Sequence, residues 1–339
     1  MIVSGIQKLS KGGSLSRNEM QEIFSQIMQG EATASQIAAF ITALHIKGET
    51  IDEITAAALC MRGFAQPIKV NARIILDTCG TGGSGLKTFN VSTLVALIAS
   101  AAGVTVAKHG NRSATSKAGS ADLLEKLGVN INAEPKIVEK CINEIGIGFM
   151  FAPKFHLAMK YAIGPRREIG IRTIFNILGP LTNPAQATHQ LMGVCSADLS
   201  PAIIAVLANL GLTHAMVVHS EQGMDEISTA SNTMIYELKN KQIKNYTVNA
   251  QDFGFKQSKL ADLQIKDLEH SYAIASDILK GETGAVYDLV VLNAGFALYT
   301  ADAVTDIKQG IELAKAVLAD GRALQKLELL KKHSNEINS

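Results

Sequence analysis

Cysteine is scarce in this sequence, and none of it stands in a paired motif. The four cysteines, Cys60, Cys79, Cys141 and Cys195, lie far apart and form no CxxC spacing. That distribution argues against a disulfide framework and against a zinc site built from thiolates. We therefore expect the protein to work in a reducing compartment.

The chain also lacks a strong net charge, a basic leader and a long apolar run. A formal net charge of +1 provides no overall field that would hold a nucleic acid or an anionic membrane. The most apolar run, residues 94–107, is too short to span a bilayer, and no basic segment followed by an apolar core opens the sequence. We expect a soluble protein of the cytoplasm.

Hydrophobic residues are plentiful enough to fill a large core. With 339 residues, 47% of them hydrophobic, the chain is long enough for two domains. The first 66 residues predict only helices, because capping boxes begin at Ser16 and Thr50 and because Gly30 and Gly48 stand where helices would end. An apolar stripe at helical spacing over residues 37–44 is typical of a core or a subunit interface.

From about residue 70 the pattern changes to strands that alternate with helices. Strands are predicted at 73–77, 104–107, 147–151, 190–195 and 214–218, helices at 93–102 and 199–210, a hairpin near 233–248, and two helices after residue 302. Such alternation is typical of a mostly parallel sheet flanked by helices. We predict an α/β protein with a small N-terminal helical domain, residues 1–66, joined by helices from about 155–190, and a large α/β catalytic domain, residues 70–339.

The large domain begins with a glycine-rich loop. An apolar run ends at Asp77, four glycines follow within residues 80–85, and Ser92 and Thr93 open an apolar helix. Glycine lets backbone N–H groups approach an anion closely, and the start of a helix adds partial positive charge. The pattern favours a phosphate-binding loop and a strongly anionic ligand.

Three other interpretations fit this loop less well. A dinucleotide-binding loop would need an acidic residue about 20 positions further on, whereas the second predicted strand ends in Lys108. The phosphate loop of nucleotide hydrolases requires Gly-Lys-Ser or Gly-Lys-Thr after the glycines, and this chain lacks it. A turn that binds no ligand would not require four glycines.

Two more loops follow predicted strands, at the end of the sheet where open α/β folds bind ligands. The first, residues 108–122, carries three cations, a histidine and two glycines and predicts a pocket for a polyanion; a solvated basic loop is the alternative. The second carries Asp225 and Glu226, whose mutual repulsion a bound Mg²⁺ would relieve. Most such acidic pairs are solvated surface, and only the position after a strand favours a metal site.

A third stretch, residues 163–184, contains three arginines ahead of a turn that Pro180 and Pro184 make rigid. The guanidinium groups of Arg166, Arg167 and Arg172 could bind a carboxylate or a phosphate. By itself, the stretch predicts only a connector with an exposed arginine.

Together these loops resemble the anthranilate phosphoribosyltransferase family. The resemblance rests on Gly-Thr-Gly-Gly at 80–83, Thr-Phe-Asn-Val-Ser-Thr at 88–93, Lys-His-Gly-Asn-Arg at 108–112, Gly-Ser-Ala-Asp at 119–122, Asn-Ile-Leu-Gly-Pro-Leu-Thr-Asn-Pro at 176–184 and residues 219–226. It covers nearly the whole chain. It implies a homodimeric enzyme that transfers the phosphoribosyl group of phosphoribosyl pyrophosphate to the amine of anthranilate, with Mg²⁺, in tryptophan biosynthesis.

The resemblance also implies which residues form each part of the site. The phosphoribosyl pyrophosphate site would consist of Gly80, Thr81, Gly82, Gly83, Ser84, Thr88, Asn90, Val91, Ser92, Thr93, Lys108, His109, Gly110, Asn111, Arg112, Ser113, Ala114, Thr115, Ser116 and Ser120. Anthranilate would contact Gly80, Asn111 and Arg166, and Mg²⁺ would bind Ser92, Asp225 and Glu226. Lys108, Asn111 and Arg166 are the expected catalytic residues.

Two positions depart from the family pattern. Ser84 stands where the family usually has aspartate, and Ser220 stands where it usually has glycine. The missing carboxylate at position 84 would weaken the organisation of the diphosphate or the metal. His109 is a candidate proton acceptor, with a packing or hydrogen-bonding role as the alternative.

Two rival functions stay open at this point. A pyrimidine-nucleoside phosphorylase would share the two-part plan and a similar glycine loop, but it would not be expected to carry the 108–112 motif or the acidic pair. A paralogue that has lost catalysis and binds nucleic acid would need basic grooves and an eroded anthranilate site, whereas Asn111 and Arg166 are present.

Overall fold

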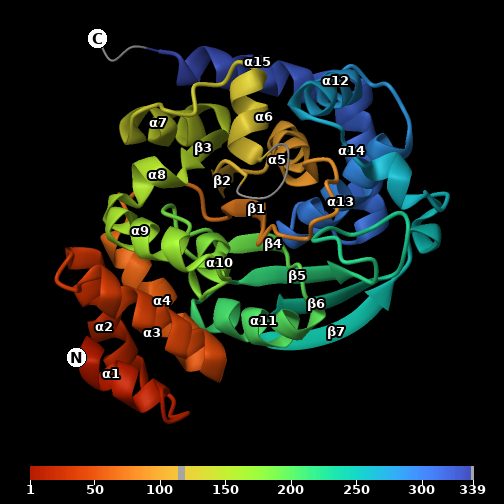
Figure 1. The fold of residues 1–339 in the computed structure, drawn as a ribbon. Coiled ribbons are helices and arrows are strands. Elements are labelled where there is room, and N and C mark those ends of the chain that lie inside the picture. Colours follow the sequence, from red (N-terminus) through yellow and green to blue (C-terminus); the bar gives the residue numbers. More distant parts are fainter. Residues whose placement is uncertain (114–118, 337–339) are drawn as a thin grey trace.

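The computed structural model describes residues 1–113 and 119–336 of the chain. The first 65 residues form a lobe of four helices, drawn in red and orange in Figure 1. These are α1 (Ile2–Leu9), α2 (Arg17–Gln29), α3 (Ala34–Lys47) and α4 (Ile51–Phe64). The predicted capping boxes at Ser16 and Thr50 are confirmed, as are the helix ends at Gly30 and Gly48. A third capping box, between Thr33 and Gln36, was not predicted.

The lobe has its own apolar interior. The predicted stripe on α3 is fully buried, and the ring of Phe40 meets the ring of Phe24 edge to face, with centroids 6.3 Å apart. Helix α9 (Lys160–Ile169), from the middle of the chain, packs on α2 and α3. It follows the short helix α8 (Ala152–Phe155), so a central segment of the sequence completes the lobe (Figure 1).

Seven strands of the described residues form one sheet in the order β3-β2-β1-β4-β5-β6-β7. They are β1 (Leu76–Gly80), β2 (Val106–Gly110), β3 (Ile147–Phe151), β4 (His189–Gly193), β5 (His214–Ser220), β6 (Thr233–Lys239) and β7 (Gln242–Val248). The first five pair in parallel and the last two form the predicted antiparallel hairpin. The chain runs outward from β1 to β3 and then returns to β4 beside β1. Ligands bind at such a reversal in strand order.

Two predicted strands lie two or three residues later in the chain than expected, and this shift changes the context of a predicted loop. Strand β1 covers 76–80 rather than 73–77, and β2 covers 106–110 rather than 104–107. Lys108 and His109 therefore lie within β2, fully paired with β3 and buried, and not in a loop after it. The prediction was wrong because it ended the strand where the apolar residues end.

Helices cover both faces of the sheet (Figure 1). The larger ones are α5 (Val91–Ala101), α6 (Ser120–Lys126), α7 (Pro135–Ile145), α11 (Ser200–Asn209), α12 (Leu268–Leu279), α13 (Ala285–Thr300), α14 (Ile307–Ala319) and α15 (Arg322–Ser334). Helix α13 is buried almost throughout and packs against α5, α14 and β4. No helix in the described part of the chain is long and apolar enough to cross a membrane. The predicted fold class, a helical N-terminal part and a mostly parallel sheet flanked by helices, is confirmed.

Candidate active site

The glycine loop follows β1, at the reversal in strand order. The backbone N–H of Thr81 donates to the carbonyl of Gly193 at the end of β4, over 2.9 Å. Its hydroxyl accepts from the N–H of Cys195 at 3.2 Å. Gly82 and Gly83 have φ angles of 62° and 82°, values that glycine adopts without strain. The loop is thus tied to β4 at its base, while these two glycines are exposed.

Helix α5 begins close behind this loop. Its first turn contains Val91, Ser92 and Thr93, and the side chain of Asn90 caps it by accepting from the N–H of Thr93 at 3.2 Å. Thr78 in β1 donates its hydroxyl to the carbonyl of Ser92 at 2.8 Å. The positive end of an 11-residue helix is therefore fixed beside the glycine loop.

The side chain of Lys108 extends from β2 to β1 and to the first turn of α5. Its Nζ donates to the carbonyl of Thr78 and to the Oγ of Ser92, the latter at 3.1 Å. Burial lowers the pKa of Lys108, and the nearby carboxylate of Asp77 opposes that effect. Asp77 is itself buried, which raises its pKa, and it accepts from the His109 N–H and from Asn183. Asp77 and Asn183 were not predicted as site residues, because their role appears only once β1 and β2 are paired.

His109, next to Lys108, is held neutral. Its Nδ1 lies 3.2 Å from the carbonyl of Gly179, and its ring lies 5.0 Å from the ring of His156. Burial is the main cause that lowers the pKa of His109 to about 3 and that of His156 to about 4. The Nε2 atoms of both rings are buried without a partner among the described residues. Neither histidine carries a charge near neutral pH.

The predicted basic loop is only partly described. Ala114, Thr115 and Ser116, which the resemblance placed in the site, lie outside the described residues. Ser120 donates its hydroxyl to the carbonyl of Asn111 at 3.3 Å. Arg112 forms ion pairs with Asp122 at 2.9 Å and Glu125 at 2.8 Å. The guanidinium of Arg112 is therefore already balanced by two carboxylates of α6.

The acidic pair after β5 meets the glycine loop directly. Asp225 Oδ2 accepts from the N–H of Gly82 at 3.1 Å. Burial raises the pKa of Asp225. Burial also raises the pKa of Glu226, and repulsion by the Asp225 carboxylate raises it further. Oε2 of Glu226 is buried and has no hydrogen-bond partner among the described residues.

This donor set fits Mg²⁺. An orphaned carboxylate oxygen beside a second, half-buried carboxylate suits a small hard cation, and Mg²⁺ is commonly held by one or two carboxylates together with substrate phosphates. The described residues contain no group of three histidine, cysteine or acidic side chains that could enclose a metal ion. Ser92, the third predicted ligand, already accepts from Lys108.

The three arginines of the connector take different positions. Arg166 in α9 lies over the ring of Phe175, with Cζ 4.9 Å from the ring centroid. Within the described part of the chain its guanidinium has no hydrogen-bond or ion-pair partner. Arg172 donates to the carbonyl of Gly83 at 3.4 Å and to Sγ of Cys195 at 3.0 Å. Arg172 thus touches the glycine loop, although the resemblance did not assign it to the site.

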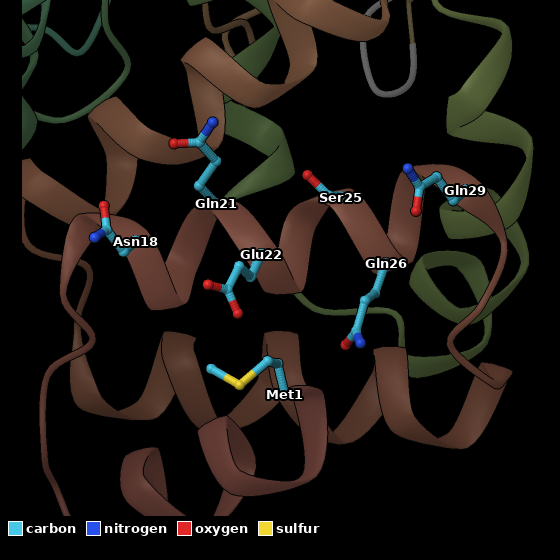
Figure 2. A pocket seen from close by; sticks show the side chains of 7 residues that line it. All are labelled: Met1, Asn18, Gln21, Glu22, Ser25, Gln26 and Gln29. Carbon is cyan, nitrogen blue, oxygen red and sulfur yellow. The ribbon is translucent and has the colours of Figure 1, made fainter.

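A separate cavity of about 410 Å³ lies on the helical lobe, away from the strand ends. Figure 2 shows its lining, which comes from the polar side chains of α2 and from Met1. The lining residues are Met1, Asn18, Gln21, Glu22, Ser25, Gln26 and Gln29. This cavity contains none of the predicted site residues.

Comparisons with known proteins agree on one family. Residues 3–65 match the helical bundle domain of a glycosyl transferase family, and residues 72–324 match the a/b domain of that family. The chain is 49% identical to the anthranilate phosphoribosyltransferase of Alkaliphilus metalliredigens over 337 residues, which cover 99% of each chain. It is also 49% identical to the enzyme of that name from Acetivibrio thermocellus, over 100% of this chain and 98% of the relative.

Solved structures give the same result. The crystal structure of anthranilate phosphoribosyltransferase from Thermus thermophilus superposes with a TM-score of 0.93 at 40% identity, covering 98% of this chain and 99% of that one. The Saccharomyces cerevisiae enzyme in complex with PRPP and Mg superposes with a TM-score of 0.91 at 26% identity, covering 99% and 98%.

Proposed function

The chain belongs to the family of anthranilate phosphoribosyltransferases, and we propose that the junction of β1, β4 and β5 holds its two substrates and Mg²⁺. The enzyme transfers the phosphoribosyl group of phosphoribosyl pyrophosphate to the amine of anthranilate. The products are N-(5-phosphoribosyl)anthranilate and pyrophosphate, in a step of tryptophan biosynthesis. The observation that carries the proposed site is the hydrogen bond from Gly82 to Asp225, because it joins the glycine loop to the acidic pair.

The diphosphate of the donor binds to the glycine loop and the start of α5. The loop already holds one anion, the carboxylate of Asp225, through a backbone N–H. Lys108 contributes a positive charge at the same place, through its contact with Ser92. The other contacts to phosphoribosyl pyrophosphate are those implied by the family motifs. Arg112 contributes less than those motifs imply, since Asp122 and Glu125 neutralise it.

Anthranilate binds through its carboxylate to Arg166, with Asn111 and Gly80 beside it. Arg166 is half-buried, lies over Phe175 and has its donors free within the described residues. A planar guanidinium so held can form two parallel hydrogen bonds to one carboxylate. The substrate's amine is thereby aligned with C1 of the ribose.

Catalysis rests on charge stabilisation and alignment. The bond between C1 and the diphosphate oxygen breaks, the amine nitrogen bonds to C1, and the amine loses one proton. Positive charge develops on the ribose and negative charge on the departing diphosphate, where Lys108 and the loop N–H groups stabilise it. Asp225 and Glu226 would hold Mg²⁺, which would supply further positive charge to the diphosphate. His109 is neutral and can accept a proton, but its contact with Gly179 equally supports a packing role.

We extend the proposal to the organisation of the protein. The helical domain spans residues 1–66, with the segment from about 155–190 added to it, and the catalytic domain spans residues 70–339. The packing of α9 on α2 and α3 supports this division. The enzyme works as a homodimer in the cytoplasm.

The two rival functions are less well supported. The curated relatives at 49% identity are named anthranilate phosphoribosyltransferases. Lys108 and the acidic pair, which a nucleoside phosphorylase would not be expected to have, lie at the proposed site. A paralogue devoted to nucleic acids would not be expected to retain Asn111 and Arg166.

A fluorescence assay tests the proposal most directly. Anthranilate is fluorescent, and its consumption can be followed with phosphoribosyl pyrophosphate and Mg²⁺ present, and with each omitted in turn. We expect consumption only when all three are present. No consumption by a folded protein would contradict the proposed function.

A further inference from the structure

A buried asparagine on α13 holds the backbone next to the acidic pair. Asn293 is 3% exposed and lies in the middle of an otherwise almost entirely apolar helix. Its Oδ1 accepts from the N–H of Ile227 at 2.9 Å, and its Nδ2 donates to the carbonyl of Ile227 at 2.8 Å. Nδ2 also donates to the carbonyl of Leu289, one turn earlier in the helix, at 2.8 Å. One side chain therefore satisfies both backbone groups of the residue that follows Glu226.

The other end of the acidic pair is held in the same way. Met224, which precedes Asp225, donates its N–H to Oγ of Ser220 at 2.9 Å and accepts from the Ser220 N–H at 3.0 Å. Ser220 is the position where the family usually has glycine, and its hydroxyl here has a definite partner. The residues on both sides of Asp225 and Glu226 are thus fixed by hydrogen bonds: Ser220 holds Met224, and Asn293 holds Ile227.

Anchoring Ile227 also constrains Glu226. The peptide group between the two residues is planar, so fixing the N–H and the C=O of Ile227 fixes that plane and with it the position of the Glu226 Cα atom, from which the side chain departs. An amide is required for this, because a buried N–H and a buried C=O both need a partner and an apolar side chain offers neither. Glu226 cannot hold itself in place, since its Oε2 has no partner among the described residues.

We propose that Asn293 is a positioning residue for the metal-binding carboxylates, an inference that rests on the proposed function of Asp225 and Glu226. The chain offers matched variants to test it. Asn293→Leu keeps the branched shape of the side chain and removes all three hydrogen bonds, whereas Asn293→Asp keeps an acceptor for the Ile227 N–H and loses the donor. Thr300→Val is the control, because Thr300 is buried in the same helix and, among the described residues, its hydroxyl donates only to the carbonyl of Phe296.

The first measurement is binding of Mn²⁺, detected by electron paramagnetic resonance, to the full chain with inorganic diphosphate present. Removing a group that hydrogen-bonds to a metal ligand weakens metal affinity about 10- to 100-fold. Asn293 acts on the residue beside the ligand, so we expect the lower end of that range, about tenfold, for Asn293→Leu and a smaller loss for Asn293→Asp. In the metal-free protein, the Ile227 amide should also exchange its hydrogen faster in Asn293→Leu, and less so in Asn293→Asp, which keeps the acceptor of that N–H. Thr300→Val should bind Mn²⁺ as the wild type does, even if it melts at a lower temperature.

The second measurement is the Mg²⁺ concentration that half-saturates turnover, which should rise by the same factor while the KM for anthranilate changes less than about twofold. Wild-type Mn²⁺ affinity in Asn293→Asp, or an equal loss in Thr300→Val, would overturn the proposal. So would wild-type protein that binds no Mn²⁺ at all. If wild-type protein consumes no anthranilate but binds Mn²⁺, the proposed function fails while the metal measurement still decides the role of Asn293.

Discussion

Gly193, at the end of β4, lies so close to Asp225 that a Cβ atom on it would sit 1.6 Å from the Asp225 carbonyl oxygen. The added methyl group would clash with the backbone of Asp225, which cannot move aside as a flexible side chain could. The variant Gly193→Ala should therefore displace the acidic segment and destabilise the fold by about 1–3 kcal/mol, as overpacking does.

Gly63→Ala is the matched control for this prediction. Gly63 lies in α4, and a Cβ atom on it would meet nothing within 4 Å. The substitution should stabilise the protein by about 0.5–1 kcal/mol, because alanine favours helix more than glycine does. Urea unfolding and Mg²⁺ titration of turnover check both variants, and normal Mg²⁺ dependence in Gly193→Ala would contradict the packing argument.

Asp225 and Glu226 are expected to be indispensable for metal-dependent turnover. Replacing both by alanine removes the two carboxylates that would hold Mg²⁺ and also the acceptor of the Gly82 N–H. We expect turnover to disappear at every Mg²⁺ concentration in the fluorescence assay. Glu221→Ala, an exposed carboxylate five residues before Glu226, should be as active as the wild type. Undiminished activity of the double variant would remove the pair from the metal site.

The sequence predicts a strand well where the strand is apolar and buried along its whole length. Strand β3 matches its prediction residue for residue, because all of Ile147–Phe151 is buried and lies in an apolar run. Strand β2 was predicted to end too early, since Lys108 and His109 are polar but buried, and their partners come from β1. Helix α13 was missed because it is apolar on every side and shows no helical period.

The sequence predicted where in the fold the candidate site lies, but it did not predict which residues contact one another there. The rule that ligands bind at the carboxyl ends of parallel strands brings the glycine loop and the acidic pair to one edge of the sheet. The hydrogen bond that joins Gly82 to Asp225 spans 143 positions in sequence, and no local pattern predicts it. Asn293 gave no signal at all, because one asparagine in an apolar helix has no motif around it.

Arg166 should determine the affinity for anthranilate. Losing a charge-assisted hydrogen bond costs about 1.5–3 kcal/mol, so Arg166→Ala should raise the KM for anthranilate roughly 10- to 100-fold. The KM for phosphoribosyl pyrophosphate should change less than about twofold. Arg167→Ala is the control, because Arg167 is exposed on the same helix. Steady-state kinetics with each substrate varied in turn will decide, and equal losses toward both substrates would count against the assignment.

A buried ion pair stabilises the helical lobe. Glu53 is fully buried, accepts from Lys47 Nζ at 2.7 Å and also accepts from the backbone N–H groups of Leu15 and Thr50. Glu53→Ala leaves Lys47 buried without its partner, which should cost about 3–5 kcal/mol in the free energy of unfolding. Asp52→Ala, one residue earlier, breaks an exposed pair with Arg17 and should cost about 1 kcal/mol or less. Similar losses in urea unfolding of the two variants would show that Glu53 has no special role.

Stability should depend on pH through His156. Its pKa is about 4 in the folded protein, lowered mainly by burial, and about 6.5 in an unfolded chain. Between these values only the unfolded chain binds the proton, so this histidine makes the folded state less stable as the pH falls below about 6.5. For one such proton, the free energy of unfolding changes by about 1.4 kcal/mol per pH unit. His109 acts in the same direction, because its folded pKa is about 3.

The contribution of His156 has to be measured as a difference, because other buried groups titrate with the opposite sign. Burial raises the pKa values of Asp225 and Glu226, so these carboxyls bind protons in the folded state first and favour folding as the pH falls. Urea unfolding of the wild type and of His156→Gln at pH 7, 6 and 5 isolates the one group. We expect the difference in the free energy of unfolding between the two proteins to change by about 1.4 kcal/mol per pH unit in the lower part of that range. The variant should lose less stability than the wild type as the pH falls. A gap that stays constant from pH 7 to pH 5 would mean that His156 takes up its proton equally in both states, and therefore that it is not held neutral against His109.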